Sequence, residues 1–435
     1  MHGIRRVFDS LKRYSGMVWA AGRIALIAGA IATSSYGPAS VEERNGSATM
    51  HAARALTAKV RLGIDVLAAR RFAPLQGLRV GLLTHDAGRD AAGRRTIDVL
   101  AAAPEIKLVA IFSPEHGLAS VHEGNVDHDH DATTGLPVTS LYGAIRRPPD
   151  HMLDGLDAVV IDLQDVGVRF YTYATTMAYM LEAAARRRLP VVVLDRPNPI
   201  APAGVHGPVL DRALRSFVGY FPMPVMHGMT IGELASLFNA ENQLGAQLTV
   251  VPMTGYKRTD WHEATGLAWV NPSPNLKAVA PTLLYPGIGL VELTNVSVGR
   301  GTPTPFELVG APWIDGHALA DYLRGRAVPG VAIQPAEFTP RADRFAGRRC
   351  HGVLLQLTDR GRLDAVRLGV ELAVALRRLH PTHFRAREMA SLLGSSQALA
   401  GIEAGEDAGR IAARWQPARA AFMTLRAKHL MPDYQ

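Results

Sequence analysis

The sequence contains a single cysteine, Cys350, among its 435 residues. The chain can therefore form no internal disulfide and offers no zinc–thiolate site. No apolar stretch approaches the ~20 residues that a membrane helix requires, so we expect no integral membrane segment in the mature protein. Because no cysteine lies near the N-terminal apolar run, a lipoprotein anchor is excluded there as well.

Several common catalytic and nucleotide-binding motifs are also missing. The segment THDAGRDAAG at 84–93 lacks the G-x-G-x-x-G order that lets a backbone approach a pyrophosphate, and no P-loop motif occurs. Neither G-x-S-x-G nor H-E-x-x-H is found, which removes the usual signatures of serine hydrolases and helical zinc proteases. We therefore expect no nucleotide cofactor, and carboxylate chemistry becomes the leading option.

The composition is that of a globular protein, with 48% hydrophobic and 20% charged residues. A chain of this length can bury a large core and is expected to divide into two domains. The formal net charge is +8, but about half of this excess lies before Ser40 and the remainder is dispersed. The charge pattern thus does not indicate a nucleic-acid partner.

The N-terminus has the layout of a secretory signal peptide. A basic section is followed by the apolar run Ile24–Ala32 and then by small, turn-forming residues up to Ala39. We predict a signal peptide at 1–39, a linker at 40–60, and export to the periplasm or beyond the cell.

From residue 61 onward, buried strands alternate with helices. Apolar, β-branched runs predict strands at Leu78–Leu83, Leu108–Phe112, Ala158–Leu163 and Val191–Leu194. Helical spacing predicts helices at Arg95–Ala103 and Thr175–Arg188. This alternation is typical of an α/β fold with a doubly wound, mostly parallel sheet. We expect this domain to span 61–282, and a smaller α+β domain to span 283–435. The second domain is predicted to contain a strand at Gly352–Thr358 and helices at Ala365–Arg378 and Phe384–Leu393, and its tail from Arg410 onward carries no functional motif.

Polar side chains follow each of the four predicted strands. They come in the segments Thr84–Asp86, Ser113–Gly117, Gln164–Arg169 and Asp195–Pro199. In doubly wound sheets, ligands bind beyond the carboxyl ends of the strands. Polar loops occur in every α/β protein, but four together predict a functional site at this edge.

The run DHDHD at 127–131 is a candidate metal site. Neighbouring residues of a loop cannot all face one ion, and no acidic or histidine partner follows at ligand spacing. We therefore favour a polar loop over the sheet and predict no metal.

A longer series of loop motifs runs through the chain in one order. It comprises PEHG at 114–117, DATTGLP at 131–137, SLYG at 140–143, DVGVRFYTY at 165–173, LDRPNP at 194–199, MHGMTIGEL at 226–234, NPSPN at 271–275, YPG at 285–287 and SVGRGT at 297–302. This series resembles the exo-acting β-N-acetylmuramidases of the NamZ type over about residues 62–385. One departure is Leu118-Ala119-Ser120, where family members commonly have an aromatic residue and a glycine.

The resemblance implies hydrolytic release of N-acetylmuramic acid from the non-reducing end of peptidoglycan fragments. It also implies a Rossmann-like domain without a dinucleotide, joined to a smaller C-terminal domain, with the site in the cleft between them. In that family the glutamate of PEHG is the favoured catalytic residue, which is Glu115 in this chain.

Glycoside hydrolysis independently calls for a proton donor such as Glu115 and for a second group on the other face of the sugar. His116 is expected to orient or tune Glu115. The second group is left open among Asp165, Asp195 and Glu292, with Asp165 preferred as a support for the sugar's own acetamido group.

Substrate contacts are expected from the remaining loop residues. The lactyl carboxylate of muramic acid suits an arginine, Arg169 or Arg300, although either could instead tie loops together. Aromatic rings could stack on the sugar or simply pack in the core. Besides the two arginines, the expected substrate contacts comprise Tyr171, Tyr173, Trp269, Asp195, Asn198, His227, Asn271, Ser273, Asn275 and Glu292. Thr230 and Glu233 are expected to cap a helix.

Two further functions stay open at this stage. The first is a non-catalytic module that binds muropeptides or other acidic sugars, and the second is a metal-dependent hydrolase.

Overall fold

The structure is a computed structural model that describes residues 59–124 and 127–435. The predicted signal peptide and nearly all of the predicted linker lie outside the described residues. Within these ranges, no helix has both the length and the apolar character needed to cross a membrane.

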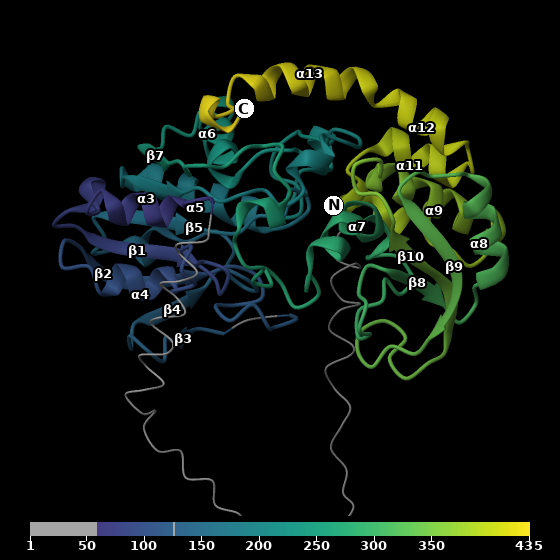
Figure 1. The fold of residues 1–435 in the computed structure, drawn as a ribbon, viewed down its shortest axis with the longest axis horizontal. Coiled ribbons are helices and arrows are strands. Elements are labelled where there is room, and N and C mark those ends of the chain that lie inside the picture. Colours follow the sequence, from purple (N-terminus) through teal and green to yellow (C-terminus); the bar gives the residue numbers. More distant parts are fainter. Residues whose placement is uncertain (1–58, 125–126) are drawn as a thin grey trace, which may run out of the picture. The chain divides into compact units, whose positions relative to one another are not determined.

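A seven-stranded sheet forms the first part of the described chain (Figure 1). Its strand order is β3-β4-β2-β1-β5-β6-β7, and all neighbouring strands are parallel except β3, which pairs antiparallel to β4. The strands are β1 (Arg79–Thr84), β2 (Lys107–Ser113), β3 (Asp129–His130), β4 (Pro137–Ser140), β5 (Ala158–Asp162), β6 (Val191–Leu194) and β7 (Leu248–Val251). The chain starts in the middle and builds outward on both sides, so the order reverses between β1 and β5.

Successive residues of the central strands enter two different hydrophobic cores. Val80 and Val160 pack in one core together with α3 and α4, whereas Leu83 and Val159 pack in the other together with α5 and α6. These helices are α3 (Gly63–Ala69), α4 (Thr96–Ala101), α5 (Tyr173–Arg187) and α6 (Ile231–Glu241). Because side chains alternate across a strand, a sheet covered on both faces needs apolar residues at every position. The predicted doubly wound sheet is confirmed.

The second part combines a small antiparallel sheet, of order β8-β10-β9, with several helices. Its elements are α7 (Val279–Ile288), β8 (Leu308–Ala311), α8 (Gly316–Gly325), β9 (Val331–Phe338), β10 (Cys350–Leu357), α9 (Ala365–Leu379), α10 (Ala390–Leu393), α11 (Ser396–Glu403), α12 (Ala408–Arg414) and α13 (Gln416–Ala427). The mixed character of this part agrees with the predicted α+β class.

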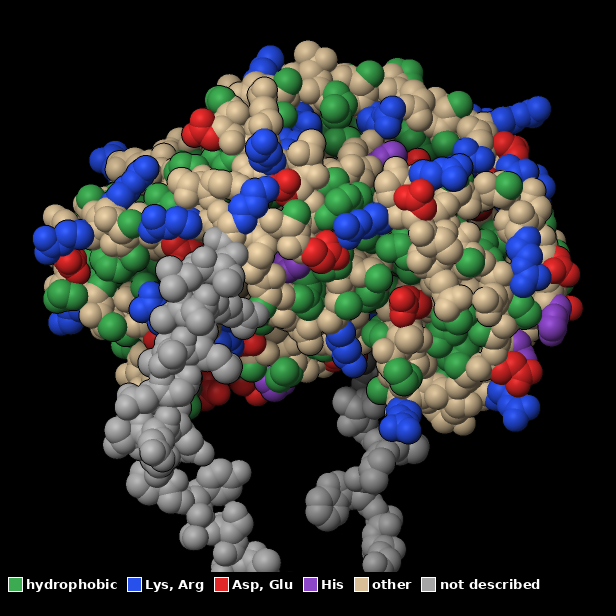
Figure 2. Space-filling model, in the orientation of Figure 1, with side chains coloured by type: hydrophobic (Ala, Val, Ile, Leu, Met, Phe, Trp, Pro, Cys, Tyr) green, Lys and Arg blue, Asp and Glu red, His purple; other side chains and the backbone are tan. Residues whose placement is uncertain are grey.

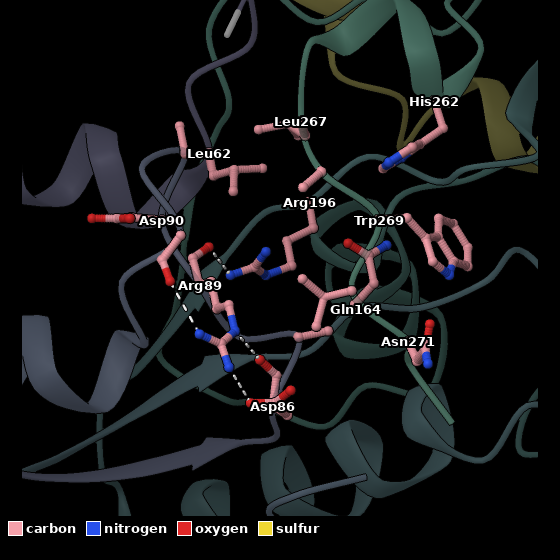
Figure 3. Close-up of a pocket in the computed structure, with 15 residues that line it drawn as sticks. Leu62, Asp86, Arg89, Asp90, Gln164, Arg196, His262, Leu267, Trp269 and Asn271 are labelled. Carbon is pink, nitrogen blue, oxygen red and sulfur yellow. Dashed lines mark hydrogen bonds and ion pairs between the residues drawn. The ribbon is translucent and has the colours of Figure 1, made fainter. Parts of the chain in front are cut away.

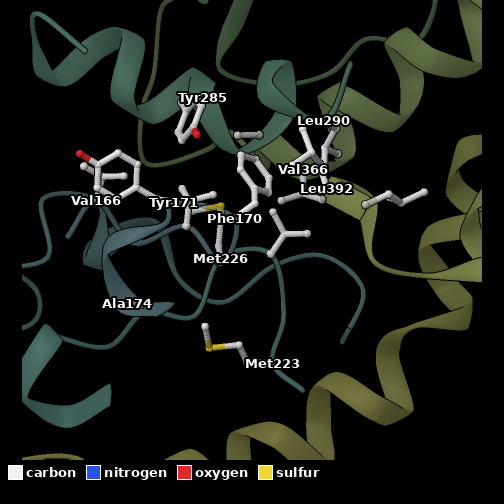
Figure 4. Close-up of a cluster of buried hydrophobic side chains, with 14 of the residues drawn as sticks. Val166, Phe170, Tyr171, Ala174, Met223, Met226, Tyr285, Leu290, Val366 and Leu392 are labelled. Carbon is white, nitrogen blue, oxygen red and sulfur yellow. The ribbon is translucent and has the colours of Figure 1, made fainter. Parts of the chain in front are cut away.

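Side chains from both parts pack into one core. Figure 4 shows Phe170 and Tyr171 beside Tyr285, with Leu290 and Val366 in the same cluster. The Phe170 and Tyr285 rings meet edge to face at 5.2 Å. The predicted boundary near residue 282 falls inside α7, and its position stays a prediction.

The C-terminal tail returns to the first part of the chain, although its sequence gave no functional signal. Beyond α13, Tyr434 is buried in the same core as α3 and α4. The Arg426 guanidinium donates to the Gly228 carbonyl, and the Met431 amide donates to Glu233 Oε1 at 2.8 Å. The tail from Arg426 to Tyr434 thus holds the loop that precedes α6 in place, and we call this segment the C-terminal strap.

Most of the strands and helix caps predicted from the sequence are present, and one predicted helix is wrong in part. The four predicted strands are present with ends shifted by one residue at most, and the capping box of Thr230 and Glu233 is confirmed. The helix predicted over Phe384–Leu393 is wrong in part, because a 3-10 turn at Ala386–Met389 precedes the short α10.

Charged side chains of both signs alternate over the visible surface (Figure 2). No single-sign patch dominates this face, which agrees with the dispersed charge of the sequence.

Candidate functional site

Glu115 lies directly after β2, in a tight turn. His116 and Gly117 have φ values of 72° and 73°, and this left-handed conformation turns the chain sharply after the strand. The side chain of Glu115 is half-buried, and its Oε2 accepts a hydrogen bond from Thr172 Oγ1 at 2.6 Å. Its backbone carbonyl accepts from the Tyr173 hydroxyl at 3.1 Å. The start of α5 thereby fixes the glutamate.

Tyr142 is a neighbour of Glu115 that the sequence did not single out. Partial burial raises the pKa of Tyr142, and the charge of Glu115 raises it further. Tyr142 therefore stays protonated beside the carboxylate. Thr172 was missed as well. Both residues lie inside quoted motifs, SLYG and FYTY, and their place within these motifs is the available signal.

The buried Tyr285 senses three carboxylates electrostatically. Burial raises the pKa of its hydroxyl far above the ordinary value, and the charges of Glu292, Glu115 and Asp165 act in the same direction. The sequence singled out Glu115 and Asp165 and left Glu292 open.

Asp165 and His227 form a buried pair. His227 Nε2 lies 3.3 Å from Asp165 Oδ2, which also accepts from the Gly167 amide at 2.6 Å. His227 Nδ1 accepts from the Met229 amide, so the proton of a neutral ring sits on Nε2, which makes no hydrogen bond among the described residues. Asp165 Oδ1 is buried and has no hydrogen-bond partner among the described residues.

Arg300 sits among carboxylates. Its Nη1 lies 2.5 Å from Glu292 Oε1, its Nη2 lies 2.9 Å from Glu123 Oε2, and its Nε lies 3.3 Å from Asp343 Oδ2. Burial lowers the pKa of Arg300, but the three carboxylates outweigh burial and raise it. Burial raises the pKa of Glu292, and Arg300 opposes that shift. The guanidinium is therefore charged and already engaged.

Asn275 extends this group into the predicted NPSPN loop. Its Nδ2 donates to Glu123 Oε1 at 2.6 Å, so both oxygens of Glu123 are held, one by Asn275 and one by Arg300. Burial raises the pKa of Glu123, but Arg300 and Asn275 outweigh burial and lower it. Neither Glu123 nor Asp343 was anticipated from the sequence.

Two tyrosines of the FYTY motif hold the NPSPN loop through hydrogen bonds. The hydroxyls of Tyr171 and Tyr173 both donate to the Pro272 carbonyl, at 2.8 and 2.9 Å. Both rings are buried, which favours the packing alternative over stacking on a sugar. In the same loop Ser273 is buried, whereas Asn271 is exposed.

His116 packs on the loop that follows Glu115, where its Nδ1 lies 2.8 Å from the His122 carbonyl. The same loop is tied to β1 by His85, whose Nε2 accepts from the Gln164 amide and whose Nδ1 donates to Ser120 Oγ at 3.1 Å. Burial lowers the pKa of His85 far below its ordinary value, with Arg196 and His116 acting in the same direction. His85 is therefore neutral and structural.

Three predicted site residues are engaged elsewhere. Asp195 is fully buried and accepts four hydrogen bonds, from the Arg196 and Gly232 amides and from the Thr230 and Tyr434 hydroxyls. These contacts disfavour it as the second catalytic carboxylate.

Asn198 and Arg169 are the other two. Asn198 joins the Met229 carbonyl to the Ile200 amide, and a Cβ on Gly167 (φ +81°) would lie 2.5 Å from its Oδ1. Arg169 is buried and donates to four backbone carbonyls, those of Pro208, Met223, Leu392 and Leu393. Its contacts favour the loop-tying alternative over a lactyl clamp.

The DHDHD run at 127–131 does not converge on one point. His128 Nδ1 accepts from the Ser140 amide, while Asp131 pairs with Arg95 at 2.6 Å and accepts from Thr134. Across residues 59–124 and 127–435, no three His, Cys, Asp or Glu side chains are arranged as a metal site.

Comparison with known proteins gives consistent matches over most of the chain. The family description "Exo-beta-N-acetylmuramidase NamZ, N-terminal" matches residues 80–280, and its C-terminal counterpart matches residues 283–431. The peptidoglycan beta-N-acetylmuramidase NamZ of Bacillus subtilis (strain 168) is 42% identical over 378 residues, which cover 86% of this chain and 91% of that protein.

Two solved structures of DUF1343 family proteins from Bacteroides fragilis have the same fold. The first has a TM-score of 0.80 at 33% identity and covers 86% of this chain and 99% of its own. The second has a TM-score of 0.70 at 32% identity and covers 86% and 98%. The family predicted from the loop motifs is confirmed, and this chain belongs to the exo-β-N-acetylmuramidase NamZ family.

Proposed function

We propose that this protein is an exo-acting β-N-acetylmuramidase, which hydrolyses the glycosidic bond of the N-acetylmuramic acid at the non-reducing end of peptidoglycan fragments. The observation that carries the proposal is Glu115, a half-buried carboxyl group at a strand end, which accepts a hydrogen bond from Thr172 at 2.6 Å. Membership in the family and the 42% identical muramidase support the substrate class.

Glu115 acts as the general acid in this proposal. It donates a proton to the glycosidic oxygen as the bond to the leaving sugar breaks, and it then deprotonates the water that completes hydrolysis. The hydrogen bond of Thr172 to Oε2 fixes the carboxyl plane. This preorganisation matters because proton transfer requires a heavy-atom distance of about 2.6–3.2 Å.

Asp165 is the proposed supporting carboxylate for the acetamido group of the sugar. Its Oδ1 is buried and has no hydrogen-bond partner among the described residues, so the side chain has to turn toward the sugar for this oxygen to accept from the amide N–H. In this arrangement the acetamido carbonyl attacks the anomeric carbon, and Asp165 orients it. Glu292 is the alternative, although Arg300 already holds it at 2.5 Å.

The lactyl carboxylate is proposed to bind Arg300 by displacing Glu123. Arg300 and Asn275 hold one oxygen each of the Glu123 carboxylate, which is how two donors would hold a substrate carboxylate. The side chain of Glu123 is 38% exposed, whereas that of Glu292 is 16% exposed, so Glu123 is the easier of the two to move.

Export belongs to the same proposal, because peptidoglycan lies outside the cytoplasmic membrane. The signal-like N-terminus supports it.

The proposal is tested on a synthetic MurNAc–GlcNAc disaccharide and on a chromogenic N-acetylmuramide. The wild type should release N-acetylmuramic acid from both, and Glu115→Gln should lower kcat at least ~100-fold, as expected for loss of a general acid. Its unfolding free energy should stay within about 0.5 kcal/mol of the wild type, because glutamine still accepts from Thr172.

Two outcomes would reject this assignment. Saturable binding without product in the wild type would leave a binding protein, and normal turnover by Glu115→Gln would reject Glu115. Asp165→Asn and Glu292→Gln assayed in parallel decide the second group, since the supporting carboxylate should show the larger loss of kcat.

A further inference from the structure

A polar pocket opens where the strand order of the large sheet reverses. It has a volume of about 450 Å³, within the ~300–1,000 Å³ typical of small-molecule sites. Its walls come from the loop after β1 (Asp86, Arg89), from Gln164 after β5, from Arg196 after β6, and from the segment 262–271. Figure 3 shows Asp86, Arg89 and Asp90 on one side and Trp269 and Asn271 on the other. Such a reversal is where open α/β sheets bind ligands.

The charges around this pocket are paired within the protein. Arg89 pairs with Asp86, and Arg94 reaches Asp90 at 2.6 Å. Arg196 is buried and forms two hydrogen bonds with Asp162, at 2.5 and 2.8 Å. Since each guanidinium already has its carboxylate, the pocket offers donors and acceptors without a net charge. This pattern suits a neutral ligand rich in hydroxyl and amide groups more than an anion.

Trp269 supplies an apolar surface in these polar walls. The ring is half-buried, and its Nε1 donates to the Leu276 carbonyl at 3.1 Å, which fixes its orientation. His262 packs edge-on against it, with ring centroids 5.1 Å apart. Gln164 donates through Nε2 to the Asp165 and Pro197 carbonyls, so its position is fixed too. A fixed indole beside fixed amide groups can pack on the C–H face of a pyranose and bind its polar rim.

The pocket is connected to Glu115 through short structural links. Asn271 in its wall precedes Pro272, whose carbonyl accepts from the Tyr173 hydroxyl at 2.9 Å. The same hydroxyl lies 3.1 Å from the Glu115 carbonyl. On the other wall, Gln164 precedes Asp165. Because one hydroxyl lies 2.9 Å from the Pro272 carbonyl and 3.1 Å from the Glu115 carbonyl, the pocket wall and the loop of Glu115 are neighbours, which is the placement that a sugar chain spanning both requires.

We propose that this pocket binds the leaving part of the substrate, a neutral N-acetylhexosamine that follows the terminal muramyl residue, with Trp269 as its platform. This inference rests on the proposed function, and it names the subsite that makes the enzyme prefer a sugar chain over an artificial leaving group.

The test compares two substrates in the variant Trp269→Ala. On the MurNAc–GlcNAc disaccharide, kcat/KM should fall about tenfold or more relative to the wild type, mainly through KM. On an aryl N-acetylmuramide, whose leaving group makes no sugar contact, kcat/KM should change less than about twofold. Trp269→Phe should recover most of the loss, because an aromatic face is retained. Equal losses on both substrates would overturn the inference.

A matched control and a binding measurement separate folding and catalysis from the pocket. Trp313 is also half-buried but stacks on His383, outside the pocket, so Trp313→Ala should affect neither substrate selectively. Calorimetric titration with N,N′-diacetylchitobiose should show binding to the wild type that Asn271→Ala and Trp269→Ala weaken. Unchanged binding in both variants would refute the subsite. Failure of the proposed function has a different signature, namely that the wild type releases N-acetylmuramic acid from neither substrate.

Discussion

Glu115 and Asp195 both follow strands of the same parallel sheet, yet they have opposite environments. Glu115 is half-buried, and Thr172 holds one of its oxygens. Asp195 is fully buried and accepts four hydrogen bonds. The same contrast separates the buried Arg169, which donates to four carbonyls, from Arg300, which lies among three side-chain carboxylates. A polar residue at a strand end is thus available for chemistry only if hydrogen bonds from neighbouring residues do not occupy all of its polar atoms.

Asp195 should make the unfolding free energy depend strongly on pH, and this is the largest change that we predict. Burial raises the pKa of Asp195 to about 7, although the Gly232, Tyr434 and Thr230 donors oppose this shift. The native state then keeps a proton that the unfolded state releases near pH 4, so stability is lost as the pH rises from about 4 to about 7. Because one pKa unit corresponds to about 1.4 kcal/mol, the loss should amount to a few kcal/mol.

Urea unfolding of the wild type and of Asp195→Asn between pH 4 and pH 8 measures this effect. As the pH rises, the unfolding free energy of Asp195→Asn should increase relative to that of the wild type, since asparagine carries no charge to bury. Asp321→Asn is the surface control, because that side chain is 74% exposed. Parallel curves for the wild type and Asp195→Asn would contradict the assignment of a buried, proton-retaining carboxyl group.

The two arginines provide the second test of the contrast. Arg169→Lys should lower the unfolding free energy by about 2–4 kcal/mol, because one ammonium group cannot reach four carbonyls. Arg300→Lys should cost less than about 1 kcal/mol in stability. It should instead raise KM for an N-acetylmuramide about tenfold, and leave KM for the matching N-acetylglucosaminide, which lacks the lactyl group, nearly unchanged.

Denaturant titration and steady-state kinetics on both variants measure these outcomes. Two results would contradict this contrast. Arg169→Lys would alter KM while the protein remained stable, or Arg300→Lys would affect both glycosides equally.

The smallest expected change in unfolding free energy comes from removing the Tyr434 hydroxyl. Tyr434→Phe removes one of the four donors to Asp195 and also the group that accepts from the Met253 amide at 2.8 Å. We expect a loss of about 1 kcal/mol in unfolding free energy with activity retained. Tyr322→Phe is the matched control, because its hydroxyl only accepts from the exposed Arg378. Equal stability of Tyr434→Phe and the wild type would show that the tail is not a strap.

Much of the fold could be predicted because it depends on local pattern. Runs such as Val191–Leu194 are buried on both faces and carry a periodicity that sequence displays directly. The helix after Thr230 was predictable for a similar reason, since its capping box is a matter of residues three positions apart. The helix expected at Phe384–Leu393 is wrong in part, because a 3-10 turn and an α-helix differ little in pattern over so few residues.

The doubly wound sheet, the family and the position of Glu115 at a strand end could be predicted from the sequence, because strand periodicity and the motifs are each contained in short stretches of chain. Which polar side chains remain available follows only from the folded arrangement. Whether Asp195 meets Tyr434 or Arg300 meets Glu123 depends on contacts between residues more than 170 positions apart, and no local pattern encodes such contacts.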